Sequence, residues 1–161
     1  MKKIAILISI ATVVLSNNHA LAGEHGAHCL NMLSGEMKNC RVIVSELNNS
    51  LEMNFKSDKL QDVNMKLKGN QITEISTGEY AKKRTKETIG ASLVLGPLGA
   101  LVGLFAKQDR TQLAIEYVDY QNNKNVTMID IPTKHSEPLM KDLESLTGLQ
   151  IRNTEGTGNS E

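Results

Sequence analysis

Every second residue is apolar in two stretches near the middle of the chain, residues 51–56 and 62–68. Alternation with a period of two is typical of antiparallel strands that have one face in a core and the other in solvent. A β-branched-rich stretch precedes them, and turn-forming residues separate them. The pattern predicts a four-stranded meander with strands at 41–47, 51–56, 62–68 and 71–75, and a two-residue hairpin loop at Gly69 and Asn70.

A second pair of strands is predicted over Thr111–Tyr120 and Asn125–Ile131, joined by a turn of Asn122, Asn123 and Lys124. The first of these strands carries its apolar residues mainly on one face. The second has apolar residues on both faces, which indicates either a bulge or a strand that is buried on both sides.

The pattern then changes to helical spacing, with apolar residues at Leu139, Met140, Leu143 and Leu146. Ser136 is a favourable N-cap, and Gly148 is a favourable residue to end the helix. We expect a further strand near Glu79–Lys83 and a disordered polar tail over residues 152–161. These elements predict a single, mostly β domain of the α+β class over residues 41–151, with about seven strands and a C-terminal helix.

The first 22 residues have the three parts of a secretory signal peptide. Lys2 and Lys3 form a basic start, residues 4–15 are almost entirely apolar, and a cleavage site ends at Ala22. Cleavage there leaves a mature chain of residues 23–161. We therefore expect a soluble protein that is periplasmic or secreted, with membrane association depending on one internal segment described below.

The chain has two cysteines, Cys29 and Cys40, and both fall in the mature part. Disulfides persist in exported proteins, and the spacing of these two cysteines does not match a CxxC redox motif. We expect a structural disulfide that closes a short loop in a leader of residues 23–40. A metal-binding or redox pair is the alternative.

Residues 88–106 form an uninterrupted stretch without charge that is rich in glycine and leucine. Three alternatives remain open: a Gly-kinked helix or hairpin packed on the domain, a hairpin inserted into a membrane surface, and a transmembrane helix. The basic residues before it would stay outside after signal cleavage, which disfavours the transmembrane helix. If the stretch contacts a membrane or a partner, the contact residues are expected to be Lys82, Lys83, Arg84, Lys86, Leu95, Leu98, Leu101, Leu104 and Phe105.

Composition and motifs exclude several function classes. The chain has 18 basic and 18 acidic residues and only 3% aromatic residues, so nothing indicates a nucleic-acid partner. The sequence contains no HExxH, GxSxG or Walker motif. His135, Ser136 and Glu137 are interpreted as the start of the helix, and Glu116 and Asp119 as solvated strand residues. We therefore do not expect an enzyme.

The mature terminus offers one candidate metal site. Cleavage after Ala22 would expose Gly23, Glu24 and His25. The free amine, the two following amide nitrogens and the His25 imidazole can surround one ion in a plane, which suits Cu(II) or Ni(II). The alternative is a flexible polar leader without a metal, and no other cofactor is expected.

The order of the predicted elements resembles the pleckstrin-homology (PH) superfold. The runs ITEISTGEYAKKRT, GPLGAL, IEYVDYQN and DLESLTG are similar to bacterial PH-like exported proteins of unknown function, and the resemblance covers about Val42–Gly148. It implies an antiparallel roll of about seven strands with a Gly-rich apolar helical insert and a capping C-terminal helix. Phosphoinositide-binding members carry basic residues in the first hairpin loop, where this chain has the neutral residues Asn48, Asn49 and Ser50.

The sequence thus predicts a non-enzymatic, exported and envelope-associated binding or interaction module. Its partner would be a protein or a membrane surface of the cell envelope. The alternative is a small periplasmic Cu(II)- or Ni(II)-binding protein that uses Gly23, Glu24 and His25.

Overall fold

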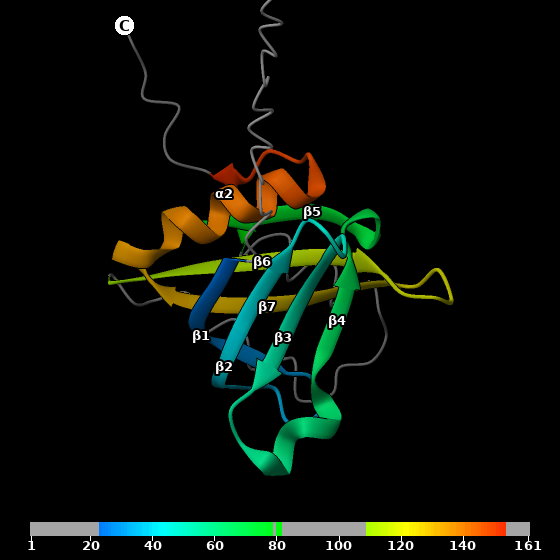
Figure 1. Ribbon diagram of the computed structural model, residues 1–161, viewed down its shortest axis with the longest axis vertical. Coiled ribbons are helices and arrows are strands. Elements are labelled where there is room, and N and C mark those ends of the chain that lie inside the picture. The colour runs from blue at the N-terminus through cyan, green and yellow to red at the C-terminus, as the bar shows by residue number, and fades with distance from the viewer. Residues whose placement is uncertain (1–22, 79, 82–108, 154–161) are drawn as a thin grey trace, which may run out of the picture.

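The computed structural model describes residues 23–78, 80–81 and 109–153, which form one curved sheet covered by a helix (Figure 1). The strands are β1 (Gly23–Asn31), β2 (Glu36–Ser45), β3 (Ser50–Phe55), β4 (Met65–Lys68), β5 (Ile72–Thr77), β6 (Arg110–Val118), β7 (Lys124–Pro132) and β8 (Arg152–Asn153). The described helices are α2 (Ser136–Thr147) and the short 3-10 helices η1 (Asp58–Val63), η2 (Gly69–Gln71) and η4 (Thr133–His135). The predicted mostly β architecture with a C-terminal helix is confirmed.

The strands follow the order β4-β3-β2-β1-β7-β6-β5-β8, and every neighbouring pair except β5 and β8 is antiparallel. Strand β1 pairs with β2 along its whole length and with β7 at His28 and Cys29. Figure 1 shows β2–β4 running across the direction of β6 and β7. Strand β1 therefore joins two halves of the sheet whose strands run in different directions.

The segment predicted to be a leader, residues 23–40, forms β1 and the first part of β2. Among the described residues, the sheet therefore begins at Gly23 and not at Arg41. The sequence of β1, GEHGAHCLN, lacks a run of alternating aliphatic residues, because its buried positions are filled by Ala27, Cys29, Leu30 and Asn31. Without that run, the usual periodicity that reveals a strand is absent.

The predicted four-stranded meander is wrong at its last connection. Gly69 and Asn70 lie in η2, and the strand that follows, β5, pairs with β6 rather than with β4. The glycine is required by packing, since a Cβ at Gly69 would overlap the side chain of Asn49 and lie 2.9 Å from the carbonyl oxygen of Leu146. In the sequence, a glycine that is needed for close packing looks the same as a glycine that is needed for a hairpin turn.

Two other predictions differ from the structure. Gly78, Tyr80 and Ala81 are helical, which is inconsistent with a strand near Glu79–Lys83, and the rest of that segment lies outside the described residues. Arg152 begins β8, so the first two residues of the predicted tail belong to the sheet; residues 154–161 lie outside the described part.

Helix α2 ends at the predicted residue, but it begins one residue earlier than predicted. Gly148 adopts a left-handed φ of 69° and its N–H donates to the Glu144 carbonyl at 2.8 Å, as expected for a glycine that ends a helix. Ser136 is the first helical residue and not the N-cap. Its hydroxyl donates to the Thr133 carbonyl at 2.8 Å, which ties α2 to η4.

The described part of the sheet has a buried cluster on each face. The larger cluster lies between the sheet and α2 and includes Leu51, Ile115, Ile129 and Leu139. The smaller one contains Leu30, Ala81, Ala114, Val126 and Met128. Because β7 keeps a regular register with β6 throughout, the apolar residues on its two faces reflect burial on both sides and no bulge. The irregularity occurs in β5 instead, between Ile72 and Glu74.

Candidate functional site

Helix α2 presents a different surface to each of its neighbours. Leu139 and Leu143 are fully buried against the sheet. Asp142 reaches β1, where its carboxylate contacts His25. On the side that faces the end of β5 and the start of β6, the helix borders a groove. The apolar residues at helical spacing thus fix the helix on the sheet and leave its other sides available for polar contacts.

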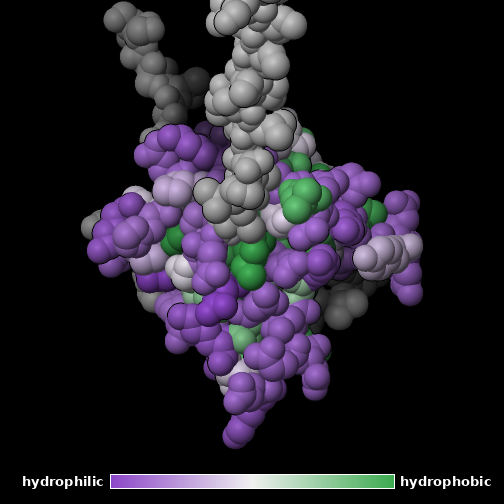
Figure 2. All heavy atoms as spheres, in the orientation of Figure 1, coloured by the Kyte–Doolittle hydropathy of each residue, from purple (hydrophilic) through white to green (hydrophobic). Residues whose placement is uncertain are grey.

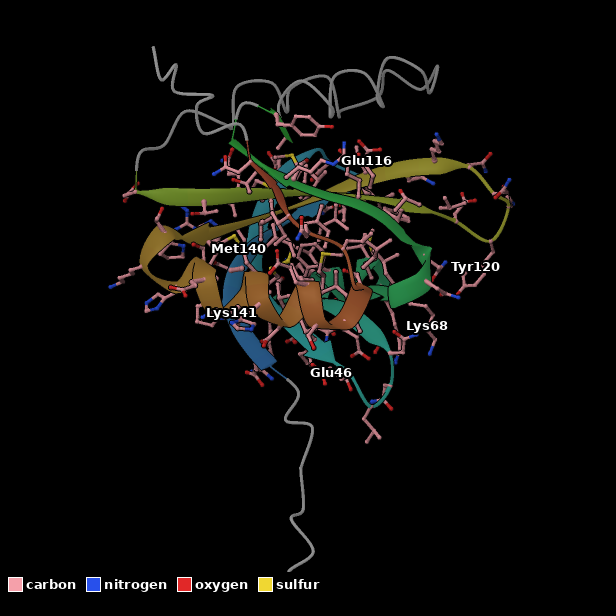
Figure 3. The ribbon with its side chains drawn as sticks, turned by 90° about the horizontal axis from the view of Figure 1, so that it is seen from above. Glu46, Lys68, Glu116, Tyr120, Met140 and Lys141 are labelled. Atoms are coloured by element: carbon pink, nitrogen blue, oxygen red, sulfur yellow. A yellow bond between two sulfur atoms is a disulfide. The ribbon has the colours of Figure 1, made fainter. Side chains whose placement is uncertain are left out.

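The groove has a volume of about 440 Å³ and is open to solvent. Residues from α2, β5, β6, η4 and β8 line it: Thr77, Thr111, Thr133, Ser136, Glu137, Met140, Lys141, Glu144, Ile151 and Asn153. Met140 and Lys141 lie on the N-terminal part of the helix (Figure 3). The groove places hydroxyl, amide and charged groups around two apolar side chains, Met140 and Ile151.

The hydroxyl groups of the groove are interlinked. Thr111 Oγ1 donates to Thr133 Oγ1 at 3.2 Å, and the carbonyl of Thr133 accepts from Ser136. A hydroxyl can donate one hydrogen bond and accept two, so the exposed Thr111 and Thr133 groups retain acceptor capacity. This edge of the groove is suited to hydrogen bonding with polar, uncharged groups.

One ion pair stands at the rim of the groove. Lys141 Nζ lies 2.8 Å from Glu137 Oε1, one helical turn away. Their hydrogen bond lowers the pKa of Glu137 and raises the pKa of Lys141, so both stay charged near neutral pH. Both side chains are largely exposed, and such pairs are weak, so they can reorient towards a ligand at little cost.

Strand β8 separates this groove from a second hollow of about 700 Å³ lined by Thr73, Glu74, Tyr80, Arg152, Asn153 and residues 148–151. The chain around β8 is held from both sides. Ile151 N–H donates to Glu144 Oε1 at 3.1 Å, and Arg152 donates to the Tyr80 hydroxyl at 2.8 Å. Because β8 pairs in parallel with Ser76 and Thr77 at the edge of β5, a short extended segment already occupies this edge.

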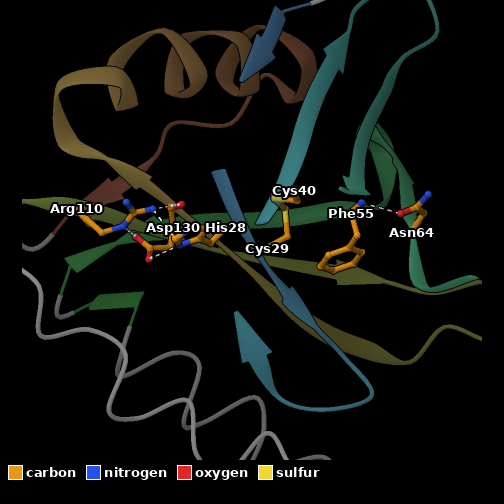
Figure 4. The surroundings of a disulfide bond; sticks show 7 residues. All are labelled: His28, Cys29, Cys40, Phe55, Asn64, Arg110 and Asp130. Atoms are coloured by element: carbon orange, nitrogen blue, oxygen red, sulfur yellow. Dashed lines mark hydrogen bonds and ion pairs between the residues drawn. A yellow bond between two sulfur atoms is a disulfide. The ribbon is translucent and has the colours of Figure 1, made fainter. Parts of the chain in front are cut away.

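A buried charge cluster lies where β1, β6 and β7 meet (Figure 4). Arg110 donates to Asp130 Oδ1 at 2.7 Å and to the Asp130 carbonyl at 3.0 Å, and His28 Nδ1 lies 3.3 Å from Arg110 Nη2. Asp130 is only 5% exposed and Arg110 18%. Sequence reasoning missed this cluster. The available signal was an aspartate within the apolar run of β7, since a buried carboxylate needs a cationic or hydrogen-bonding partner.

The predicted disulfide is confirmed. Cys29 and Cys40 are bonded, with their Cα atoms 5.7 Å apart, and both are buried. They lie diagonally across the β1–β2 pair, since Cys29 is opposite Lys38 and Cys40 is opposite Ala27. Figure 4 shows the bond near the same meeting of strands as the charge cluster.

Only two of the three residues of the predicted metal site, Gly23 and His25, come together in the structure. Glu24 is exposed and its carboxylate pairs with Arg41 at 2.9 Å. His25 Nε2 lies 2.7 Å from Asp142 Oδ2 on α2. Among the residues that the structure describes, no three His, Cys, Asp or Glu side chains come close enough to hold a metal ion. The amide groups of Glu24 and His25 belong to a strand that pairs with β2.

Two carboxylates predicted to be solvated behave differently. Glu116 is buried, on the side of β6 away from α2 (Figure 3), which corrects the prediction. Asp119 closes the β6–β7 turn by accepting hydrogen bonds from the N–H groups of Gln121 and Asn123 at 2.9 and 2.8 Å. These bonds, above all the one from Asn123, hold the pKa of Asp119 below its ordinary value of 3.8. His135 is exposed at the start of α2.

The residues predicted to contact a membrane or partner, Lys82, Lys83, Arg84, Lys86, Leu95, Leu98, Leu101, Leu104 and Phe105, lie outside the described residues. Within residues 23–78, 80–81 and 109–153, no helix is long and apolar enough to cross a membrane. The face shown in Figure 2 is mostly hydrophilic. The large exposed apolar side chains of the described part are Leu33, Leu47 and Tyr120, and each lies in or beside a different turn.

No protein-family model matches the sequence, and no curated protein is similar to it.

Proposed function

We propose that the protein is an exported, non-enzymatic binding module of the cell envelope, and that it holds an extended polar segment of a partner protein in the groove beside α2. The observation that carries this proposal is the groove itself. It places Thr111, Thr133 and Asn153 around the apolar side chains of Met140 and Ile151, next to the sheet edge.

The sheet edge beside the groove favours an extended partner. β8 is the last strand of the described sheet, and its pairing with Ser76 and Thr77 leaves its own outer side as the edge that a partner can join. Extended peptides commonly bind by adding main-chain hydrogen bonds at a sheet edge, while neighbouring pockets select side chains. Met140 and Ile151 would contact an apolar side chain of the partner, and the threonine hydroxyls would bond its polar groups.

Two observations support export. The disulfide between Cys29 and Cys40 is buried in the sheet, and disulfides persist mainly in oxidising compartments. The basic start, the apolar run and the cleavage site at Ala22 form the expected signal peptide. Cleavage at that site leaves Gly23, the first residue of β1, as the mature terminus.

A PH-like fold remains part of the proposal. Seven strands, β1–β7, precede α2 in the described residues, and this order supports the resemblance. The seven differ from those expected, because β1 replaces the strand predicted near residues 79–83. With β1 as the first strand, the first hairpin loop is residues 32–35, which carries no basic residue, and the β2–β3 loop over residues 46–49 carries none either, which argues against an inositol phosphate as ligand.

Position-dependent photocrosslinking in cells tests the groove. A photoreactive amino acid replaces Lys141 or Thr133 at the groove and, as a matched control, the exposed Lys59 in η1. We expect a discrete protein adduct from the two groove positions and none from Lys59. Met140→Arg, which fills the groove, should remove the adduct formed at Thr133. Equal adducts at Lys59, or an adduct at Thr133 that survives Met140→Arg, would show that the groove is not the binding site.

Envelope association by the apolar stretch has a separate test. Vesicle flotation of the mature protein at low salt, with and without residues 90–105, distinguishes membrane contact from packing on the domain. Flotation with anionic vesicles that salt reverses would support the basic residues and leucines as membrane contacts. If the complete mature protein stays in the soluble fraction, that part of the proposal is wrong.

A second candidate function, a small periplasmic Cu(II)- or Ni(II)-binding protein, is favoured by one observation. His25 and Gly23 both lie against the carboxylate of Asp142. This arrangement differs from the planar site expected from Gly23, Glu24 and His25 alone.

A further inference from the structure

Two potential metal donors meet between β1 and the middle of α2, and the backbone of Gly23 lies beside both. His25 Nε2 lies 2.7 Å from Asp142 Oδ2. Gly23 lies against the same two groups, since a Cβ at this residue would overlap the Asp142 carboxylate and lie 3.0 Å from His25 Nε2. The Gly23 nitrogen is bonded to that same Cα and becomes a free amine if the chain is cleaved after Ala22.

The separation of these groups is slightly short for a shared ion. Two ligands that each lie about 2.0–2.2 Å from a metal ion are about 3.0 Å apart at square angles and about 3.4 Å apart at tetrahedral angles. The 2.7 Å between His25 Nε2 and Asp142 Oδ2 is shorter than both, so a small outward movement of the carboxylate would be needed to admit the ion. The His25 side chain is mostly buried and that of Asp142 is partly exposed, so the carboxylate side remains open to an ion and to water ligands.

The planar chelate expected from the sequence would conflict with this fold. It needs the amide nitrogens of Glu24 and His25 in one plane around the ion. In β1 these residues are opposite Ile43 and Val42, and successive residues of an antiparallel strand direct their N–H groups to opposite sides. Forming the plane would require β1 to separate from β2 and His25 to leave Asp142.

We propose that the mature protein binds one divalent transition-metal ion through the Gly23 amine, His25 Nε2 and Asp142 Oδ2, with water completing the coordination. The site rests on the cleavage after Ala22 proposed above. Two nitrogen donors and one carboxylate suit Cu(II), Ni(II) and Zn(II), and Cu(II) is expected to bind most tightly. The ion would tie the mature terminus of β1 to α2.

The glycine at position 23 has a specific role in this site. Any side chain there would displace Asp142, so Gly23 lets the amine and the carboxylate lie side by side. Ions also compete with protons for the amine and the imidazole, so binding would release protons and weaken in acid.

Metal titration of the mature chain tests the site. The protein is residues 23–161 with an authentic Gly23 terminus, and the probes are Cu(II), Ni(II) and Zn(II) salts, followed by calorimetry and the visible and EPR spectra of Cu(II). We expect one Cu(II) per chain. Asp142→Asn should weaken binding at least about tenfold, since even the loss of an outer partner of a metal ligand costs 10–100-fold. Glu24→Gln, a matched carboxylate-to-amide control in β1, should leave the affinity unchanged.

Two further variants sharpen the result. His25→Gln, and a chain that retains Ala22 before Gly23, should each weaken binding to the same degree, with the folded state of every variant checked by its melting temperature. If Asp142→Asn binds like the wild type with the spectrum of a planar nitrogen site, the planar chelate is right and the proposed site is wrong. If the mature chain binds none of the three ions, metal binding by this terminus is excluded. Either result leaves the groove beside α2 to be decided by its own crosslinking test.

Discussion

The two faces of β6 and β7 are equally buried but are built from different chemistry. The face under α2 is mostly aliphatic, with Leu113, Ile115, Ile129 and Ile131, and it also buries Tyr117 and Thr127. The opposite face alternates small or flexible apolar residues with polar ones, including Ala114, Met128, Gln112, Glu116 and Asp130. An aliphatic face can be buried by any well-packed apolar surface. A mixed face also needs a hydrogen-bond or ion-pair partner for each polar group that it buries.

The two faces therefore contribute differently to the fold. The aliphatic face supplies most of the apolar area that stabilises the domain. The mixed face fixes neighbouring strands to one another through directed contacts, as Arg110 does by joining β6 to Asp130 of β7 beside His28 of β1. Two experiments test this comparison directly, and two more test the strand and the turn that connect to these faces.

Removing Arg110 should have the largest effect. Arg110→Ala leaves the carboxylate of Asp130 buried, and breaking a buried ion pair in this way costs about 3–5 kcal/mol of unfolding free energy. Chemical denaturation measures the loss. The double variant Arg110→Met with Asp130→Leu should recover most of it, because no buried charge remains. A single variant within about 0.5 kcal/mol of the wild type would mean that this cluster is solvated.

Truncating one apolar residue on each face compares the faces directly. Ile129→Ala and Met128→Ala should each lower the unfolding free energy by about 2–5 kcal/mol, since both side chains are fully buried. Lys124→Ala, at an exposed position of the same strand, is the matched control and should change little. A negligible effect for Met128→Ala alone would show that the mixed face contributes little to stability.

Removing the disulfide should cost somewhat less. Cys29→Ala with Cys40→Ala opens a loop with a sequence separation of 11, for which the chain-entropy estimate is about 3 kcal/mol. Because β1 pairs with both β2 and β7, the loss should appear as one cooperative transition at lower denaturant. Separate transitions for the two halves of the sheet would contradict the role of β1 as the strand that joins them.

The smallest effect concerns the turn between β6 and β7 and its dependence on pH. The pKa of Asp119 is lower in the folded chain than its ordinary value of 3.8, mainly through the N–H of Asn123. Its ionised form therefore stabilises the fold above pH 3.8, and this contribution is lost as the pH falls below that value through the folded pKa. Asp119→Ala should lower the free energy of unfolding relative to the wild type at neutral pH. In strong acid the two proteins should be equally stable, because the wild-type carboxyl group is then protonated. An equal difference at both pH values would exclude this carboxylate as the cause.

The sequence predicted those elements whose burial follows a simple period. The alternation around Leu113 and Ile115 and the helical spacing of Leu139 and Leu143 gave the right element types, and Gly148 gave the end of the helix. The two cysteines also predicted their own bond. In each case a local pattern carries the information.

Other features depend on contacts between distant residues. β1 has no alternating aliphatic run, and Gly69 is fixed by Asn49 and Leu146, far away in sequence. Glu116 resembles a solvated strand residue until its face of β6 is known to be buried. The groove was not predicted either, because its residues come from five elements and show no common motif.

The proposed export and oxidation of the chain are tested most directly by the intact mass of the protein recovered from the cell envelope, alkylated before and after reduction. The account predicts a chain of residues 23–161 that takes up no alkylating reagent before reduction and two equivalents afterwards. A chain that still carries residues 1–22, or two cysteines alkylated without reduction, would contradict an exported module with a disulfide between Cys29 and Cys40.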